Sequence, residues 1–309
     1  MSPGAEPDRT ELARLRRAIR RWYAANGRHD LPWRQTRDPY AVLVSEVMLQ
    51  QTQVDRVVPY WEAWLERWPD AQALAQAETA EVIRAWSGLG YNRRARNLQR
   101  AALAACERYG GIPCEPAKLR ELPGIGPYTA SAVASFAGER RTAVVDTNIG
   151  RVIARAVLGQ ERAGSPRAVE AAAELLLPPR KTRDWNLALM DLGATVCRSR
   201  NPACGACPVA RLCAWRAAGQ PAGEARQKQQ SVPFETTARF ARGRIVEALR
   251  AQSPLPEREI QALLPTEHQP HTAHYLAALE RDGLIEADGS AGWALAGHCH
   301  RMSIASPKL

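Results

Sequence analysis

Four of the seven cysteines lie in the short segment 197–213, with the spacing Cys-x6-Cys-x2-Cys-x5-Cys. Disulfides explain this segment poorly, because the other cysteines are scattered and the N-terminus has no signal-peptide pattern. Structural zinc sites usually pair two Cys-x2-4-Cys steps across a longer loop, whereas only one such step occurs here. Closely grouped thiolates with uneven gaps favour an iron–sulfur cluster, with zinc as the alternative. The segment is therefore predicted to fold as a compact loop whose metal ligands are Cys197, Cys204, Cys207 and Cys213.

The chain has 309 residues, which predicts about two domains, and its 45% hydrophobic content is sufficient for a packed core. No apolar run approaches the roughly 18 residues of a membrane span, and residues 1–10 lack an apolar signal core, so we expect a cytoplasmic protein. The net charge of +10 favours a polyanionic partner such as nucleic acid. A GC-rich genome also inflates arginine content, so an ordinary solvated surface stays open as the alternative.

Amphipathic helices separated by Gly/Pro turns follow one another from residue 9 to residue 215, which predicts an all-α fold. Residues 217–232 lack periodicity and are rich in Gln, Gly and Ala, as is typical of a linker. A second domain over residues 233–298 shows three helical segments and a small hairpin, the pattern of a winged helix that binds DNA or docks proteins. Its elements are predicted at residues 238–251, 257–264, 271–282, 284–286 and 293–295. A disordered N-terminus is predicted at residues 1–8 and a tail at residues 299–309.

Two glycines, Gly124 and Gly126, form a tight turn between two predicted helices in the segment LPGIGPYT, residues 122–129. Glycine permits close backbone approach, and the N–H groups at a helix start attract phosphate. The composition is that of a helix-hairpin-helix, a module that grips DNA phosphates. A Gly-x-Gly turn alone often only reverses the chain, so this motif needs support from others.

Glu46 lies beside an apolar stripe in a helix predicted from residue 40 to about residue 50. If it lines a desolvated cavity, its pKa rises and it becomes a proton donor near neutral pH. A solvated or salt-bridged glutamate is the ordinary alternative. Continuing the helix would turn Gln51 onto the apolar stripe, so we expect the helix to end near there and to release Gln51 toward a partner.

Asp146 follows the apolar run 143–145 and precedes the next predicted helix. A carboxylate near a helix N-terminus is expected to stay ionised, and helix capping is its ordinary role. Two carboxylates whose pKa values shift in opposite directions form the arrangement that breaks glycosidic bonds. Glu46 and Asp146 are therefore candidates for such a pair.

Further motifs accompany these segments in the order LPWR (31–34), SEVMLQQTQV (45–54), GLGY (88–91), ARNL (95–98), the hairpin, VDTN (145–148), MDLGA (190–194) and the four cysteines. In this order the chain resembles the helix-hairpin-helix glycosylases of base excision repair, and specifically the MutY-type adenine DNA glycosylases. The similarity covers about residues 10–216. It implies that the four cysteines hold a [4Fe–4S] cluster. It also implies an iron–sulfur domain (9–33 and 147–216) and a six-helix barrel (34–146) with the active cleft between them.

The resemblance implies that an adenine opposite 8-oxoguanine or guanine is flipped from double-stranded DNA and hydrolysed at its N-glycosidic bond. Glu46 would protonate N7, and Asp146 would stabilise the oxocarbenium-like sugar as an ion pair or a covalent bond, supported by Asn148 and Tyr128. We also expect a monomer associated with the nucleoid. The implied base pocket comprises Trp33, Arg34, Leu49 and Asp191, and the implied DNA contacts are Gln50, Gln51, Tyr91, Gly124 and Gly126.

Tyr128 occupies the hairpin position of the Schiff-base lysine in the related endonuclease III type. Because tyrosine cannot form that imine, we expect base removal without efficient strand cleavage. The chain departs from the family pattern in its short second domain, which replaces the usual Nudix-like domain that inspects 8-oxoguanine. It also departs at three positions: Asn92 stands where a second aromatic residue is common, Thr147 where Gly is common after the catalytic Asp, and Gly150 where a basic residue is frequent. Two alternatives stay open: a glycosylase for thymine or uracil opposite guanine, and a non-catalytic, redox-responsive DNA-binding protein.

Overall fold

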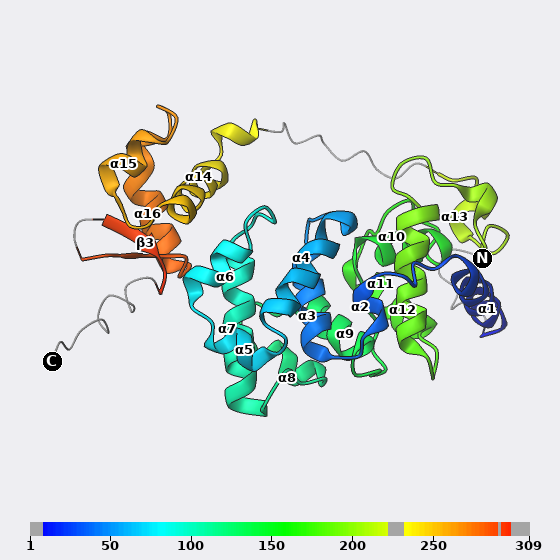
Figure 1. Cartoon of the computed structure of the whole chain (residues 1–309). Helices are drawn as coiled ribbons and strands as arrows, with labels where there is room; N and C mark the ends of the chain where they lie inside the picture. The colour runs from blue at the N-terminus through cyan, green and yellow to red at the C-terminus, as the bar shows by residue number, and fades with distance from the viewer. Residues whose placement is uncertain (1–8, 222–231, 290–291, 298–309) are drawn as a thin grey trace. The chain divides into compact units, whose positions relative to one another are not determined.

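The computed structural model describes residues 9–221, 232–289 and 292–297, which form many helices and one small sheet (Figure 1). The predicted all-α fold of the N-terminal part is confirmed. The predicted disordered N-terminus (1–8), the predicted tail (299–309) and residues 222–231 of the predicted linker lie outside the described residues. Within the described residues, no helix is long and apolar enough to cross a membrane.

The chain divides into two compact units, each assembled from separate stretches of sequence. The first unit contains Met1–Glu46, Pro113–Glu121 and Ile125–Gln227. The second unit contains Val47–Ile112, Leu122–Gly124 and Lys228–Leu309.

The helices of the first unit each bury one apolar face. In α1 (Arg9–Asn26), Leu12, Leu15 and Ile19 recur at helical spacing and are buried. Arg16 of α1 donates to the carbonyl oxygens of Leu175 and Leu176, which lie in the last turn of another helix and lack intrahelical partners there. The remaining elements are α2 (Pro32–Gln35), α3 (Pro39–Met48), α8 (Pro116–Arg120), α9 (Pro127–Phe136), α10 (Thr147–Ala156), α11 (Pro166–Leu176), α12 (Thr182–Asp191), η1 (Leu192–Val196), η2 (Cys204–Ala206) and α13 (Ala214–Ala217). The last two residues of α3, from Val47 on, are counted in the second unit.

The N-terminal part of the second unit contains four helices and a cluster of three tryptophans. The ring of Trp64 meets those of Trp68 and Trp86 edge to face, with ring centroids 4.6 and 5.4 Å apart. All three side chains are buried, so they form a rigid support for the loop that follows Trp86. The helices are α4 (Val54–Arg67), α5 (Ala71–Gln76), α6 (Thr79–Ala85) and α7 (Arg93–Tyr109).

The C-terminal part of the second unit, residues 232–297, combines three helices with a three-stranded antiparallel sheet of order β1-β3-β2. The three predicted helices and the predicted hairpin are present, and a two-residue strand that pairs with β3 was not predicted. The hydrophobic core of this part includes Ala80 and Ile83 of α6, so the C-terminal part packs directly on α6. Its elements are η3 (Phe234–Thr236), α14 (Ala238–Ala251), β1 (Leu255–Pro256), α15 (Glu257–Ala262), η4 (Gln269–His271), α16 (Thr272–Arg281), β2 (Ile285–Ala287) and β3 (Gly292–Leu295).

Candidate active site

Glu46 is a buried carboxyl group in the last turn of α3, where only 5% of the residue is exposed. The Tyr128 hydroxyl of α9 donates to its Oε2 at 2.9 Å. Burial raises the pKa of Glu46 most, the hydrogen bond from Tyr128 lowers it, Asp146 raises it and Arg34 lowers it, and the net pKa is about 7. Glu46 therefore exchanges a proton near neutral pH, and the alternative of a solvated glutamate is wrong.

Asp146 caps α10, as its ordinary role predicted, but both of its oxygens are engaged by its own turn. Oδ1 accepts from the backbone N–H of Ile149 at 2.7 Å, and Oδ2 accepts from the Asn148 side chain at 3.0 Å. Burial nevertheless raises the pKa of Asp146, against the lowering effect of these hydrogen bonds. The prediction that the two carboxylates shift in opposite directions is wrong, because the sequence pattern shows the helix terminus but not how deeply the turn is buried.

Arg151, which sequence reasoning missed, joins the Asp146 turn to the start of the cysteine segment. Its Nη2 donates to Oδ1 of Asn148 at 2.8 Å and to the carbonyl oxygen of Gly193 at 2.7 Å. Its Nε donates to the carbonyl oxygen of Cys197 at 2.7 Å. A side chain on Gly193 would collide with Asn148, with a Cβ at 2.8 Å, so the glycine allows this close approach. The orientation of Asn148, and through it that of Asp146, is thus fixed by the segment that carries the first cysteine.

Arg34 and Asp191, two residues of the implied base pocket, form a buried ion pair. Arg34 donates to both oxygens of Asp191, at 2.6 and 2.8 Å, and Arg28 adds a backbone and a side-chain hydrogen bond to the same carboxylate. Despite burial, the hydrogen bonds from Arg34 lower the pKa of Asp191, and Arg28 contributes in the same direction. The neighbouring Trp33 is buried as well. Arg34 and Asp191 are therefore held in fixed positions by hydrogen bonds and form one wall of the implied base pocket.

Two exposed residues of the second unit, Gln51 and Tyr91, lie in loops with left-handed backbone conformations. Helix α3 ends at Met48, close to its predicted end, and Gln51 has φ +58°. Tyr91 has φ +48° and is 38% exposed. Leu49 and Gln50 are half-buried in the turn between α3 and Gln51. The Gln51 and Tyr91 side chains are therefore exposed. The left-handed backbone conformations of the two loops need contacts to their backbones to hold them in place.

Arg94 supplies these contacts, and no sequence signal separates it from the other arginines of α7. Its guanidinium group donates to carbonyl oxygens on both loops, at distances of 2.6–3.1 Å. The acceptors are Val47, Met48, Gln50, Leu89 and Gly90. Burial lowers the pKa of Arg94 to about 10, so it stays charged at neutral pH. One side chain thus holds the Gln51 loop and the Tyr91 loop together.

The glycines of the predicted hairpin have different structural roles. Gly124 has φ +76°, and a Cβ at this position would lie 2.7 Å from the side chain of Asn97, so only glycine fits. Gly126 is the N-cap of α9, and a Cβ there would meet no atom within 4 Å. The space next to Gly126 at the start of α9 is therefore open.

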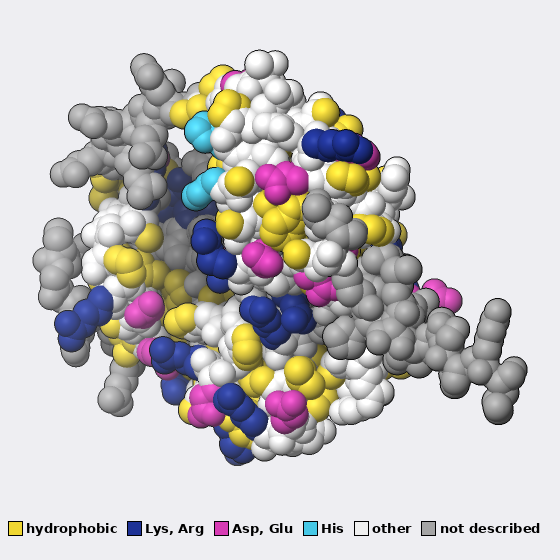
Figure 2. All heavy atoms as spheres, turned by 90° about the vertical axis from the view of Figure 1, so that its left-hand side faces the viewer, with side chains coloured by type: hydrophobic (Ala, Val, Ile, Leu, Met, Phe, Trp, Pro, Cys, Tyr) yellow, Lys and Arg dark blue, Asp and Glu magenta, His cyan; other side chains and the backbone are white. Residues whose placement is uncertain are grey.

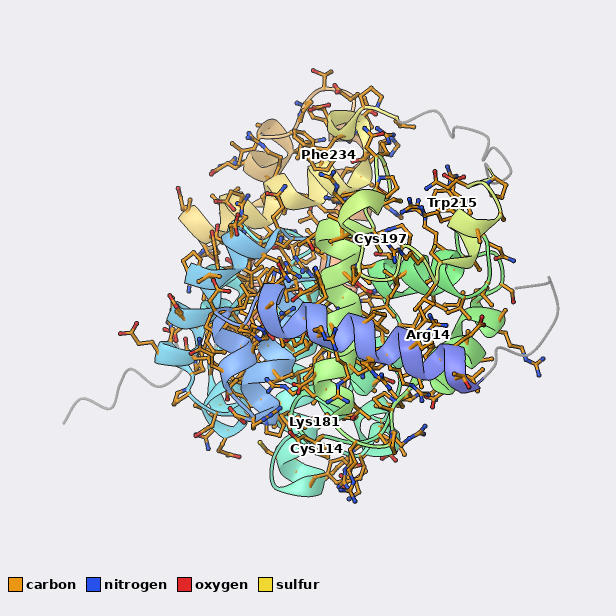
Figure 3. The ribbon with its side chains drawn as sticks, turned by 90° about the vertical axis from the view of Figure 1, so that its right-hand side faces the viewer. Arg14, Cys114, Lys181, Cys197, Trp215 and Phe234 are labelled. Atoms are coloured by element: carbon orange, nitrogen blue, oxygen red, sulfur yellow. The ribbon has the colours of Figure 1, made fainter. Side chains whose placement is uncertain are left out.

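The four cysteines of the segment 197–213 line one small cavity together with Arg155, Pro202 and Trp215. Figure 3 labels two of these lining residues, Cys197 and Trp215. Nη1 of Arg155 lies 3.6 Å from Sγ of Cys197, and its guanidinium carbon lies 4.6 Å from the centre of the Trp215 ring. Burial raises the pKa of Cys207 to about 11, so its thiolate needs a cationic partner.

Among the described residues, no three potential ligand side chains are grouped tightly enough to hold a single metal ion.

Comparisons with known proteins agree with this geometry. Residues 44–179 match the HhH-GPD superfamily of base excision DNA repair proteins, and residues 197–213 match the iron–sulfur binding domain of endonuclease III. An adenine DNA glycosylase of Mycolicibacterium smegmatis is 44% identical over 281 residues, covering 89% of this chain and 94% of the relative. A match of that extent cannot end at residue 216, so it includes part of the C-terminal region.

Two solved structures share the fold. A thermostable thymine-DNA glycosylase superposes with a TM-score of 0.62 at 31% identity, covering 68% of this chain and 98% of that protein. Endonuclease III in a non-covalent complex with DNA superposes with a TM-score of 0.60 at 21% identity, covering 70% of this chain and 100% of that protein.

Proposed function

Because the chain belongs to the adenine DNA glycosylase family of helix-hairpin-helix base excision repair proteins, we propose that it removes adenine mispaired with 8-oxoguanine or guanine from double-stranded DNA. The match to an adenine glycosylase is longer than the match to a thymine-DNA glycosylase and has higher identity, which supports adenine as the target. It also extends into the C-terminal region, which supports the same function for a chain with this short second domain.

The buried carboxyl group of Glu46, with its pKa of about 7, is the observation that carries this proposal. A purine leaves a sugar readily only when its ring accepts a proton. Protonated Glu46 gives its proton to N7 of the flipped adenine, and the electron pair of the bond between C1′ and N9 moves into the base. Thymine and uracil have no N7, so a proton donor in this position favours adenine.

Asp146 stabilises the positive charge that develops on the sugar as the base leaves. Asn148 holds one carboxylate oxygen of Asp146, and Arg151 holds Asn148 in turn. Water then attacks C1′ and releases a proton to the Glu46 carboxylate, which was left ionised when it protonated the base. Tyr128 supports Glu46 through its hydroxyl group, and it lacks the amine that strand cleavage through an imine requires. The proposed enzyme is therefore monofunctional.

DNA is the partner of the family, and the proposed contacts are a helix start, two loops and a base pocket. The N–H groups at the start of α9 bind a phosphate next to Gly126, with Gly124 shaping the turn. Gln51 and Tyr91, with Gln50 beside them, insert at the mispair and support the gap left by the flipped base. Trp33, Arg34, Leu49 and Asp191 line the base pocket, where the ion pair of Arg34 and Asp191 fixes its wall. The proposed enzyme acts as a monomer and is associated with the nucleoid.

The cysteine segment makes the chain an iron–sulfur protein, with a [4Fe–4S] cluster held by the four cysteines. When bound, the cluster supplies a structural cross-link that orders residues 197–213. Arg151 then relies on the ordered Cys197 carbonyl group to keep Asn148 in place. Arg155 adds positive charge next to the Cys197 thiolate.

Single-turnover excision on five matched duplexes tests the proposal. The duplexes hold A opposite 8-oxoguanine, A opposite G, T opposite G, U opposite G, and A opposite T, and strand breaks are read before and after alkali. Alkali-dependent cleavage at A opposite 8-oxoguanine and at A opposite G is expected, with no cleavage at T or U. Asp146→Asn should abolish excision while DNA binding survives. Cleavage confined to T or U would contradict the choice of adenine, and binding without any cleavage would contradict the enzyme.

A further inference from the structure

Two consecutive residues of the loop before α7 are each held by an arginine of α14. The guanidinium carbon of Arg239 lies 3.9 Å from the centre of the Tyr91 ring, and its Nη1 donates to the Tyr91 hydroxyl oxygen. Nη2 of Arg250 donates to Oδ1 of Asn92 at 2.9 Å. The departure of Asn92 from the family pattern thus coincides with a contact to α14.

Helix α14 is fixed relative to this loop by packing inside the second unit. Ile83 of α6 shares a hydrophobic core with Ile245 and Leu249 of α14. Nε of Arg250 donates to the carbonyl oxygen of Ile83 at 3.1 Å, which ties the same two helices together. Arg239 therefore reaches Tyr91 from a rigid support. Its position is set by the fold of the C-terminal part.

Tyr91 is held by arginines from two helices: the guanidinium carbon of Arg239 lies 3.9 Å from the centre of its ring, and that of Arg94 of α7 lies 5.6 Å from it. Tyr91 is 38% exposed, and its backbone has the left-handed φ of +48° that side chains rarely adopt. A cavity of about 610 Å³ lies beside the ring, lined among others by Asn97, Phe234 and Arg239. Arg239, the nearer of the two arginines and the one that also bonds the hydroxyl group, limits rotation of the ring toward this cavity.

General attraction of DNA by positive charge does not explain the placement of Arg239. In Figure 2, the Lys and Arg side chains of the described residues are interspersed with Asp and Glu on the face drawn there. Arg244 of the same helix is also exposed and carries the same charge without lying at the Tyr91 loop. Arg239 differs because it meets Tyr91 both over the ring and at the hydroxyl group.

We propose that Arg239 is a positioning residue for Tyr91, through which the C-terminal part of the chain sets the efficiency of base flipping at the mispair. This inference rests on the proposed function, in which Tyr91 inserts at the gap left by the flipped adenine. Arg239 keeps the phenol ring turned outward before DNA binds, so less conformational freedom is lost when the ring inserts. The C-terminal part thereby takes part in recognition of the mispair without contacting the flipped base.

A double-mutant cycle between Arg239→Ala and Tyr91→Ala tests this relationship in the full-length holoprotein. The readout is the single-turnover excision rate on A opposite 8-oxoguanine, together with the fluorescence of 2-aminopurine placed at the target position. Arg239→Ala should slow excision by about tenfold and reduce the fluorescence rise on binding. The double variant should be no slower than Tyr91→Ala alone. Independent, multiplicative effects would overturn the proposal.

Two further variants separate positioning from charge and from folding. Arg244→Ala removes the same charge from α14 and should leave excision and flipping unchanged. Arg239→Lys keeps the charge and the aliphatic stem but loses the planar group that stacks and donates together, so it should behave like the alanine variant. Full activity of Arg239→Lys, or equal losses in Arg239→Ala and Arg244→Ala, would show that charge alone matters. The wild-type duplex panel decides the function separately, and the fluorescence cycle tests the positioning even if no adenine is cut.

Discussion

The hydroxyl group of Tyr128 donates a hydrogen bond to Oε2 of Glu46, with 2.9 Å between the two oxygens. This bond favours the ionised form of Glu46, whereas burial and the neighbouring Asp146 favour the protonated form. Burial is the largest of these effects, and the pKa settles at about 7 instead of the ordinary value of 4.5. A proton donor for purine departure is thus balanced between opposing effects, and each effect can be removed separately.

Glu46→Gln should change how the stability of the protein depends on pH. The pKa of Glu46 in the folded state lies above its unfolded value, so its contribution to stability is complete below about pH 4.5 and is lost as the pH rises through 7. The free energy of unfolding of the wild type should fall by about 2–3 kcal/mol more than that of Glu46→Gln between pH 5 and pH 8. Urea unfolding with the cluster intact measures this difference. Glu62→Gln, at an exposed position on α4, should follow the wild type, and parallel curves for wild type and Glu46→Gln would refute the raised pKa.

Tyr128→Phe should move the pH dependence of excision upward. The variant loses the hydrogen bond that lowers the pKa of Glu46, so Glu46 stays protonated to higher pH. The decline of the single-turnover rate on the alkaline side should therefore begin at higher pH than in the wild type. Rates measured from pH 5 to pH 9 on A opposite 8-oxoguanine check this. An unchanged or lower apparent pKa would mean that Glu46 is not the group that limits the rate.

The sequence predicted the features that depend on local pattern. The cysteine spacing, the glycines of the hairpin and the apolar stripe beside Glu46 are each visible within a short stretch of chain. The partners of Arg94, Arg151 and Arg239 could not be predicted from the sequence. In a sequence, an arginine that binds distant carbonyl groups or rings cannot be distinguished from any other helical arginine. The direction of the pKa shift of Asp146 was missed for the same reason, since burial arises from tertiary packing. Strand β1 has two residues, which is too short to give a periodic signal.

Arg34→Met should destabilise the protein strongly, because it leaves the buried carboxylate of Asp191 with Arg28 as its remaining cationic partner. A loss of about 3–5 kcal/mol in the free energy of unfolding is expected. Adding Asp191→Asn to this variant removes the uncompensated charge and should restore part of the loss. Arg37→Met breaks an exposed pair with Glu139 and should cost less than about 1 kcal/mol. Additive losses for Arg34→Met and Asp191→Asn would show that the pair is not coupled.

Arg94→Lys should separate the two loops that carry Gln51 and Tyr91 while preserving the positive charge. The guanidinium group of Arg94 reaches the carbonyl oxygens of Gln50 at 2.6 Å and Leu89 at 2.8 Å through different nitrogens, and a single ammonium group cannot span both loops. Excision should slow by about 10- to 100-fold, because a small misplacement of inserting side chains is costly in rate. The pH dependence should stay unchanged, since Glu46 is untouched.

The matched control for this change is Arg93→Lys, at the adjacent position, whose side chain is 67% exposed. It should excise adenine at the wild-type rate. Hydrogen exchange of the backbone amides in residues 49–53 and 88–92 gives an independent readout, and both segments should exchange faster in Arg94→Lys only. If a single segment responds, Arg94 does not couple the loops, and the Gln51 and Tyr91 side chains act independently at the mispair.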